Sequence, residues 1–265
     1  KRDVQLLAAV EKILGNEKKI SEITPGLIDD YRHIRKKDPS PTKKGASIAP
    51  ATINKETSQL ITMLNKAVSH GKLNQNPLSG KIKKLVEDNV RKKVLNQEEF
   101  ERLVSELKSP LREMFIVAFY LCMRQGEIIK LTWSSVDLKE GFIRLPAENT
   151  KNNLSRVVPI HPFVEECLKQ VEKKDGEDRV FLSNGKPINQ FSGNFQRQWK
   201  DATKKVGLED FHFHDSRHCS INNLRLAQND YFRIMAISGH KTMSVFKRYN
   251  YVTEDELKNV KWRQV

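Results

Sequence analysis

The stretch that most constrains the fold is "SPLREMFIVAFYLCM" (109–123), which is apolar on nearly every side of a helix. A helix of this kind has no face suited to water, so it is buried in the core of a larger domain. It is shorter than the ~20 apolar residues that a membrane span needs, and no longer apolar run occurs elsewhere. The sequence therefore predicts several helices packed around 109–123 and no membrane partner.

The sequence on both sides of this stretch adds further helices and one hairpin. "LNQEEFERLVSEL" (95–107) offers Asn96 as N-cap and has two glutamates in its first turn, where they suit the helix dipole. "GFIRLPAENTKNNLSRVVPI" (141–160) changes to strand period around a polar turn, and the remainder returns to helix. We predict a mixed α/β domain over 95–265, mainly α with a small antiparallel β-sheet, ending in a tail over 253–265.

The first third of the chain is helical throughout. Thr24 followed by proline supplies a helix start. The charged string "EDNVRKKV" separates this part from the apolar helix described above. We predict a helical domain over 1–86 and a linker over 87–94. Apolar residues recur at helical spacing in three segments, 3–14, 24–37 and 51–71.

Charge is unevenly distributed along the chain. Lys and Arg number 47 against 33 Asp and Glu, a net of +14, and residues 1–94 alone hold 20 against 10. Such an excess favours a polyanionic partner, most often nucleic acid, although a basic but otherwise ordinary protein is the simpler alternative. The three cysteines form no CxxC pair, which argues against a disulfide framework or a zinc site and fits a reducing cytosol.

Two cationic residues stand at positions that could serve chemistry. Arg124 ends the apolar helix in "LCMRQGE", where it is either paired with Glu127, three residues on, or held for a ligand. Lys151 lies in the turn of the predicted hairpin, where lysines commonly serve solubility. Neither residue identifies a function by itself.

The segment "FHFHDSRHCS" (211–220) is dense in histidine. His214 and Arg217 are three residues apart, so one helical face carries both, which suits a phosphate group. Metal binding is an alternative, but His214 and His218 lack the intervening Glu of a zinc-protease helix. Capping and core packing are the ordinary alternative.

The segment "SGHKTMSVFKRYNY" (238–251) holds two tyrosines. His240 follows Gly239, which predicts a sharp turn, and Tyr249 lies nine residues after the histidine. Tyr251 stands two residues further on. Because a tyrosine beside cations is usually a packing residue, the segment alone does not say whether either is reactive.

The order of these residues resembles that of the tyrosine recombinases, the phage integrase family. The order is an arginine, a hairpin lysine, His-x-x-Arg, Gly-His and a tyrosine nine residues later. "MRQGEIIKLTWSSVDL", "TKNNLSRVVPI", "HFHDSRH" and "SGHKTMSVFKRYNYV" are similar to the catalytic segments of the family. "ITPGLIDDYRHIR" and "ATINKETSQLITMLNKAVSHGKLNQNP" look like its helical core-binding domain. Cys122, Ser216 and Gln228 depart from its usual Gly, Leu and Gly.

The resemblance implies a reaction at a DNA phosphodiester. Tyr249 would be the nucleophile, giving a 3′-phosphotyrosyl link and a free 5′-hydroxyl. Arg124 and Arg217 would donate to the non-bridging oxygens, and Lys151 would protonate the leaving 5′-oxygen.

Three further residues take supporting roles in this reading. His214 would hydrogen-bond the phosphate and act as base toward the nucleophile, and His240 would support the phosphate or the tyrosine. Glu127 would hold Arg124 or a histidine. The resemblance implies neither a cofactor nor a metal.

The resemblance also implies partners. Double-stranded DNA would lie between the two domains, with four protomers around two DNA sites and accessory DNA-bending proteins as further partners. The location would be cytoplasmic and DNA-associated. The tail 253–265 opens with a capping box and would dock on its own domain or on a neighbouring protomer. Since the chain begins with Lys1, we expect a longer protein with an upstream arm-type DNA-binding domain, an integrase of a phage or another mobile element.

Three other interpretations stay open on the sequence. A type IB topoisomerase uses the same tyrosine chemistry but acts as a monomer and rejoins the same strand. A decayed integrase would bind DNA without cleaving it, although every expected catalytic position is filled. A histidine-based metalloenzyme would contain metal when purified.

Overall fold

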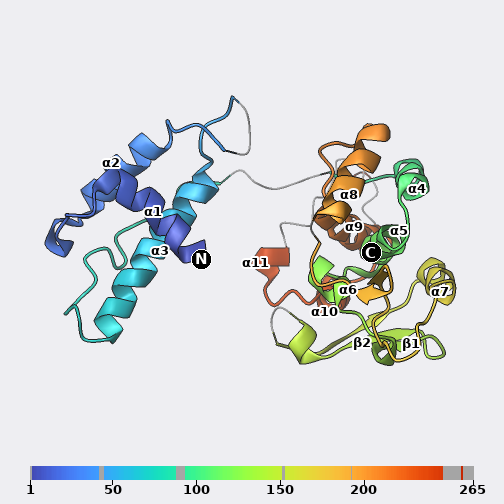
Figure 1. The fold of residues 1–265 in the computed structure, drawn as a ribbon. Coiled ribbons are helices and arrows are strands. Elements are labelled where there is room, and N and C mark those ends of the chain that lie inside the picture. The colour runs from blue at the N-terminus through green and yellow to red at the C-terminus, as the bar shows by residue number, and fades with distance from the viewer. Residues whose placement is uncertain are drawn as a thin grey trace, which may run out of the picture. The chain divides into compact units, whose positions relative to one another are not determined.

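The computed structural model describes residues 2–41, 45–87, 93–150, 153–191, 193–246 and 258. The chain divides into two compact units, Lys1–Asn89 and Val90–Val265 (Figure 1). The structure is mainly helical with small antiparallel sheets, as the sequence predicted. Among the described residues, no helix has the length and apolar character needed to span a bilayer.

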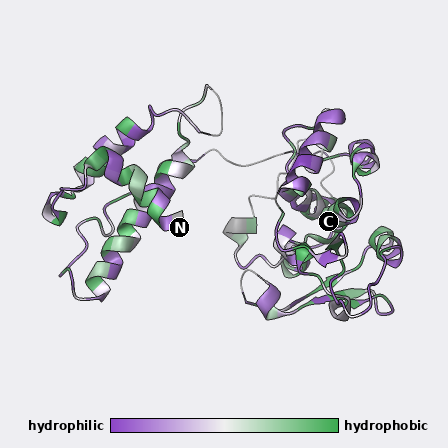
Figure 2. Cartoon of the chain, in the orientation of Figure 1, coloured by the Kyte–Doolittle hydropathy of each residue, from purple (hydrophilic) through white to green (hydrophobic). Residues whose placement is uncertain are grey.

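Helices α1 (Arg2–Leu14), α2 (Pro25–Arg35) and α3 (Pro50–Ser69) build the described part of the first unit, with a 3-10 turn at Ile20–Glu22. The Thr24 side chain accepts a hydrogen bond from the Leu27 N–H and starts α2, as predicted. Hydrophobic and hydrophilic residues alternate along α1 and α3 (Figure 2), and their apolar faces pack together.

A buried glutamate joins α2 to α3. Glu56 is 2% exposed and accepts hydrogen bonds from the Tyr31 hydroxyl (2.6 Å) and from Nη2 of Arg35 (2.8 Å). Arg35 also pairs with Asp38 at 2.7 Å. The carboxylate is therefore fully engaged inside the unit, as a buried charge must be.

Helix α5 (Leu111–Leu121) is the centre of the second unit. Only Arg112 and Tyr120 in it are not buried, which confirms the predicted core helix. It packs against α4 (Gln97–Glu106), α7 (Pro162–Lys169) and α9 (Ser216–Leu226), and Trp199 of α8 (Asn194–Lys205) contacts Phe115. Asn96 caps α4, as predicted.

The predicted hairpin forms two strands of an antiparallel sheet in the order β1-β2-β3. Ile143 of β2 faces Val158 of β3, and both side chains are buried. The prediction that everything after residue 160 is helical is wrong at a two-stranded ribbon. Its strands are only two residues long, too short for a period to be visible. The strands are β1 (Val136–Asp137), β2 (Phe142–Leu145), β3 (Arg156–Pro159), β4 (Leu182–Ser183) and β5 (Lys186–Pro187).

Short elements complete the second unit. The other described helices of this unit are α6 (Gln125–Ile129), α10 (Tyr231–Ser238) and α11 (Met243–Phe246) (Figure 1). Helix α6 packs against α5, and α10 packs against α9. A small apolar cluster of Cys122, Ile221, Ile234 and Phe246 fixes α10 and α11 against α5 and α9. The 3-10 turns are Trp133–Ser135, Ala147–Asn149 and Phe213–Asp215. Apart from Lys258, the predicted tail 253–265 lies outside the described residues.

Candidate active site

The turn after α5 places Arg124 at the start of α6. Cys122 takes a left-handed conformation with φ +53°, and Arg124 is the N-cap residue. Its Nη1 lies 2.9 Å from Oε1 of Glu127, so the ordinary pairing considered from the sequence is present. The same guanidinium donates through Nη2 to the Gly239 carbonyl at 3.2 Å. Arg124 therefore joins α6 to the end of α10 while its side chain stays 19% exposed.

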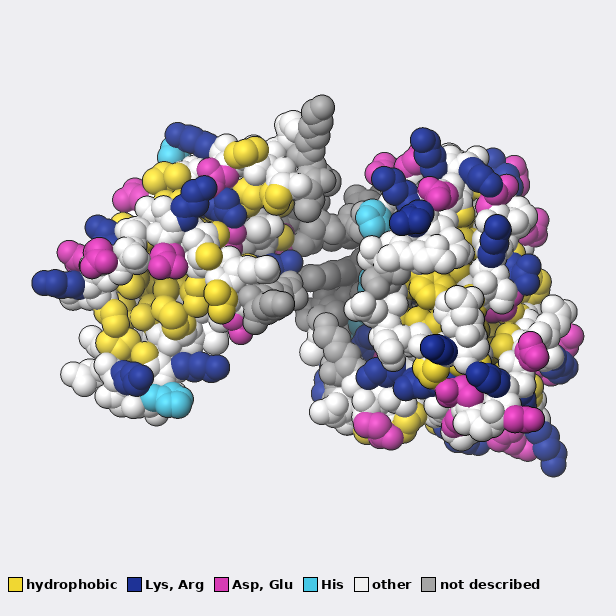
Figure 3. Space-filling view, viewed as in Figure 1, with side chains coloured by type: hydrophobic (Ala, Val, Ile, Leu, Met, Phe, Trp, Pro, Cys, Tyr) yellow, Lys and Arg dark blue, Asp and Glu magenta, His cyan; other side chains and the backbone are white. Residues whose placement is uncertain are grey.

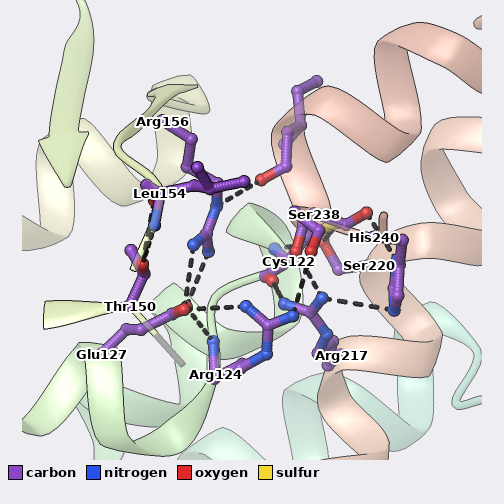
Figure 4. A network of polar contacts seen from close by, with 12 residues as sticks. Cys122, Arg124, Glu127, Thr150, Leu154, Arg156, Arg217, Ser220, Ser238 and His240 are labelled. Atoms are coloured by element: carbon purple, nitrogen blue, oxygen red, sulfur yellow. Dashed lines mark hydrogen bonds and ion pairs between the residues drawn. The ribbon is translucent and has the colours of Figure 1, made fainter. Parts of the chain in front are cut away.

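Glu127 is a buried carboxylate held by two arginines. It is 3% exposed and accepts hydrogen bonds from Nη1 (2.9 Å) and Nη2 (2.6 Å) of Arg156, in addition to Nη1 and the backbone N–H of Arg124 (Figure 4). Burial alone would raise the pKa of Glu127, but the hydrogen bonds and charges of Arg156 and Arg124 hold that pKa below its usual range. The carboxylate is ionised at neutral pH.

Arg156 is a residue of this site that the sequence interpretation missed. It opens β3, its side chain is 8% exposed, and its Nε donates to the Ile237 carbonyl at 2.8 Å. In "SRVVPI" Arg156 stands two residues before the buried Val158, so strand alternation puts both on one face. That alternation is the signal that could have found it.

Arg217 lies on α9 and is 2% exposed. Its guanidinium donates to the carbonyls of Cys122 and Ser238, and its Nη2 is 3.4 Å from Nε2 of His240. His214 lies one turn earlier, is exposed, and has its ring 6.4 Å from that of His218. Arg217 thus connects the end of α5 to the end of α10.

His240 follows the turn that ends α10. Gly239 has φ +70°, and a Cβ there would lie 3.2 Å from Cδ of Arg156, so both the backbone and the close approach favour glycine. His240 is 9% exposed, with Nδ1 2.7 Å from the Ser238 hydroxyl. Because Nε2 faces a donor of Arg217, we assign the proton to Nδ1.

The electrostatic field around His240 is strongly positive. Burial first, then the charges of Arg217, Arg124 and Arg156, lower the pKa of His240 to about 3. The imidazole is therefore neutral at physiological pH.

A cavity of about 240 Å³ opens beside these groups. Cationic side chains of Arg124, Arg156 and Lys241 line it together with His240 and Gly239. No cluster of His, Cys, Asp and Glu that could hold a metal occurs among the described residues. The cavity is suited to an anionic group of the size of a phosphate.

A larger cavity of about 950 Å³ lies elsewhere in the second unit, between α5, α7 and the β4–β5 ribbon. Its walls combine apolar residues with both signs of charge, such as Ile116, Glu113 and Lys174. None of the residues predicted for the site lines it, so it does not share this chemistry.

The described structure brings together four of the seven predicted site residues, Arg124, Glu127, Arg217 and His240. His214 lies in the 3-10 turn Phe213–Asp215 that precedes α9, with its ring 6.4 Å from that of His218. Lys151 and Tyr249, with Tyr251, lie outside the described residues, so their roles stay predictions.

Comparison with known sequences identifies the family. The sequence profile of the phage integrase family matches residues 93–256, and that of the phage integrase SAM-like domain matches residues 1–102. The chain belongs to the phage integrase family. It is 32% identical over 237 residues to the shufflon-specific DNA recombinase of Escherichia coli. It is 25% identical over 268 residues to the integrase of Salmonella phage P22. The alignments take in 88% and 96% of the chain, and 59% and 67% of those relatives.

Solved structures of similar fold support the same architecture. The Tn1549 transposon integrase in complex with transposon right end DNA aligns with a TM-score of 0.68 at 18% identity, covering 97% of both chains. A lambda integrase tetramer bound to a Holliday junction aligns with a TM-score of 0.69 at 19% identity, covering 99% of this chain and 73% of that one. At these low sequence identities, the similarity to both structures is a similarity of fold alone.

Proposed function

We propose that this chain is the core-binding and catalytic part of a site-specific tyrosine recombinase, an integrase that cleaves and rejoins DNA strands. The observation that carries the proposal is that Arg124 and His240 line one cationic cavity from separate elements, with the buried Arg217 in contact with His240 behind it. All three match positions of the family's catalytic segments, and the cationic lining of the cavity supports the binding of an anion there.

The scissile phosphodiester would occupy the cavity beside Arg124 and His240. A phosphodiester resists attack because its charge repels nucleophiles, and the charge grows in the pentavalent transition state. Preformed guanidinium donors in a site with little water stabilise that charge most. Arg217, almost fully buried, would contribute its charge from behind His240.

The covalent steps balance without water or a nucleotide. The Tyr249 oxygen forms a bond to phosphorus, the P–O5′ bond breaks, and Lys151 gives its proton to the 5′-oxygen. His214 takes the proton of the tyrosine. A 5′-hydroxyl from a second strand then attacks the phosphotyrosyl link, and two such rounds exchange two duplexes through a Holliday junction.

The partner is double-stranded DNA, held by both units. Residues 1–86 would form the core-binding domain, consistent with the charge excess of the first 94 residues. Lys and Arg side chains are spread over the visible face of both units, with Asp and Glu among them (Figure 3). Four protomers on two DNA sites and accessory DNA-bending proteins complete the proposal, with the protein on DNA in the cytoplasm. The lambda integrase tetramer bound to a Holliday junction supports the number of protomers.

Covalent capture from randomised DNA tests this function and finds the target sequence in the same experiment. Duplexes with a random core and a nick beside it, so that rejoining fails, are incubated with the wild-type chain and denatured in detergent. DNA that stays attached to protein is recovered, sequenced and used as substrate. We expect an adduct with wild type and with Tyr251→Phe and none with Tyr249→Phe. If the wild-type chain retards the random duplexes on a native gel but no adduct is ever recovered from them, the chain only binds DNA.

A further inference from the structure

We propose that Arg156 is a positioning residue for strand cleavage: it engages Glu127 so that the charge of Arg124 stays available to the phosphate, and it ties β3 to the turn that carries His240. This inference rests on the proposed function. It concerns a residue to which the sequence interpretation assigned no role in the reaction.

The contacts of Arg156 are those that only arginine can make. Its two terminal nitrogens form a paired contact with both oxygens of Glu127, at 2.9 and 2.6 Å, while Nε donates to the Ile237 carbonyl at 2.8 Å. A lysine in this place could reach one of these acceptors but lacks the planar fork. The side chain is 8% exposed, so water competes little for these acceptors.

The charges at Glu127 explain why a second arginine is needed. A buried glutamate beside Arg124 alone would neutralise Arg124 and draw its guanidinium down onto the carboxylate. With Arg156 present, two positive charges share one negative charge, and Arg124 reaches past Glu127 to the Gly239 carbonyl. The cluster therefore keeps a net positive charge at the cavity.

Arg156 also fixes the position of the turn that bears His240. Its Nε donates to the carbonyl of Ile237, and its Cδ lies 3.2 Å from the point where a Cβ at position 239 would stand. The same turn receives Arg124 at the Gly239 carbonyl. One side chain thus sets the relative positions of Arg124 and His240, which both line the cavity.

The test uses single-turnover cleavage of the duplexes captured by the wild-type chain, beside binding of the same duplexes. We expect Arg156→Gln to slow adduct formation by about 10–100-fold, as a displaced catalytic group does, while duplex affinity is unchanged. Arg156→Lys should fall between Arg156→Gln and wild type. The matched control is Arg144→Gln on β2, whose side chain is 59% exposed and should matter little.

A double variant separates this role from simple packing. In Arg156→Gln with Glu127→Gln, the carboxylate that would neutralise Arg124 is gone, so cleavage should be faster than in Arg156→Gln alone. A packing role predicts that the double variant is slower than either single one. Thermal unfolding of each variant shows whether it is folded at the assay temperature. If Arg156→Gln itself unfolds, the comparison is made at Arg156→Lys with and without Glu127→Gln.

The outcomes separate the two proposals. Failure of wild type to form an adduct would overturn the proposed function. A wild type that reacts, with Arg156→Gln as fast as Arg144→Gln or without rescue by Glu127→Gln, would overturn the role of Arg156.

Discussion

Glu56 in the first unit and Glu127 in the second are buried glutamates held by arginines, and their two clusters differ in how the charges balance. In the first unit Glu56 and Asp38 share Arg35, and the Tyr31 hydroxyl completes the set. In the second unit Glu127 alone faces Arg124 and Arg156, with Arg217 close by across His240. The first cluster has no positive charge to offer a ligand, whereas the second has an excess beside a cavity. A buried ion pair therefore indicates a binding site only when its charges do not cancel.

The largest effect expected from this comparison is on cleavage. Arg124→Gln removes a guanidinium donor at the cavity but leaves a hydrogen-bonding side chain beside Glu127. We expect the single-turnover adduct rate to fall by about 10²–10³-fold, as when one donor to a transition-state anion is lost. Lys130→Gln, at the exposed end of α6, is the control and should cleave as wild type does. Equal rates in both variants would remove Arg124 from the site.

The corresponding change in the first unit should affect stability instead. Arg35→Gln leaves Glu56 buried without its cation, which costs about 3 kcal/mol in the free energy of unfolding of that unit. All three tryptophans lie after residue 94, so their fluorescence follows the second unit, and far-UV circular dichroism follows both. We expect the dichroism to gain an earlier transition while the fluorescence transition stays in place. Lys37→Gln, an exposed residue nearby, should change neither.

The excess positive charge of the second cluster should also appear as a pH dependence. The pKa of His240 is lowered to about 3 by burial and by the surrounding arginines, against about 6.5 in the unfolded chain. Between these values the unfolded state binds more protons, so the stability that depends on neutral His240 is complete above pH ~6.5 and is lost as pH falls toward 3. From pH 7.5 to 5.5 the wild type should lose on the order of 1 kcal/mol more than His240→Asn, measured by denaturant titration of tryptophan fluorescence. An equal loss in both would mean that the field at His240 is weak.

Local chemistry made one part of this structure predictable from the sequence. Thr24 and Asn96 cap their helices because a side chain needs to reach only three residues along the chain. The pairing of Arg124 with Glu127 follows from the same short separation. The core position of α5 follows from its composition.

Contacts between distant segments made the rest unpredictable. Arg217 bonds to the carbonyls of Cys122 and Ser238, 95 and 21 residues away, and backbone carbonyls carry no sequence signal. Arg156 was missed because its acceptors come from α6 and α10. Its own strand has only four residues. Family resemblance supplied the order of the site residues, but not the excess of arginines around Glu127.

The smallest expected effect concerns backbone conformation, which also differs between the units. Among the described residues, the first unit uses only glycine at positive φ, whereas the second unit has Cys122 (φ +53°) and Gln228 (φ +61°) there. Gln228 is exposed, so Gln228→Gly should relieve the left-handed strain and stabilise the second unit by up to about 1 kcal/mol.

Cys122→Gly is the matched change at a buried position. It gains the same relief but loses a fully buried side chain whose sulfur lies 3.0 Å from the Ser220 hydroxyl, so we expect no net stabilisation. Denaturant titration followed by tryptophan fluorescence compares the two variants. If Cys122→Gly stabilises as much as Gln228→Gly, its side chain contributes nothing to packing, and the turn before Arg124 would be held by its backbone bonds to Arg217 and Ser220 alone.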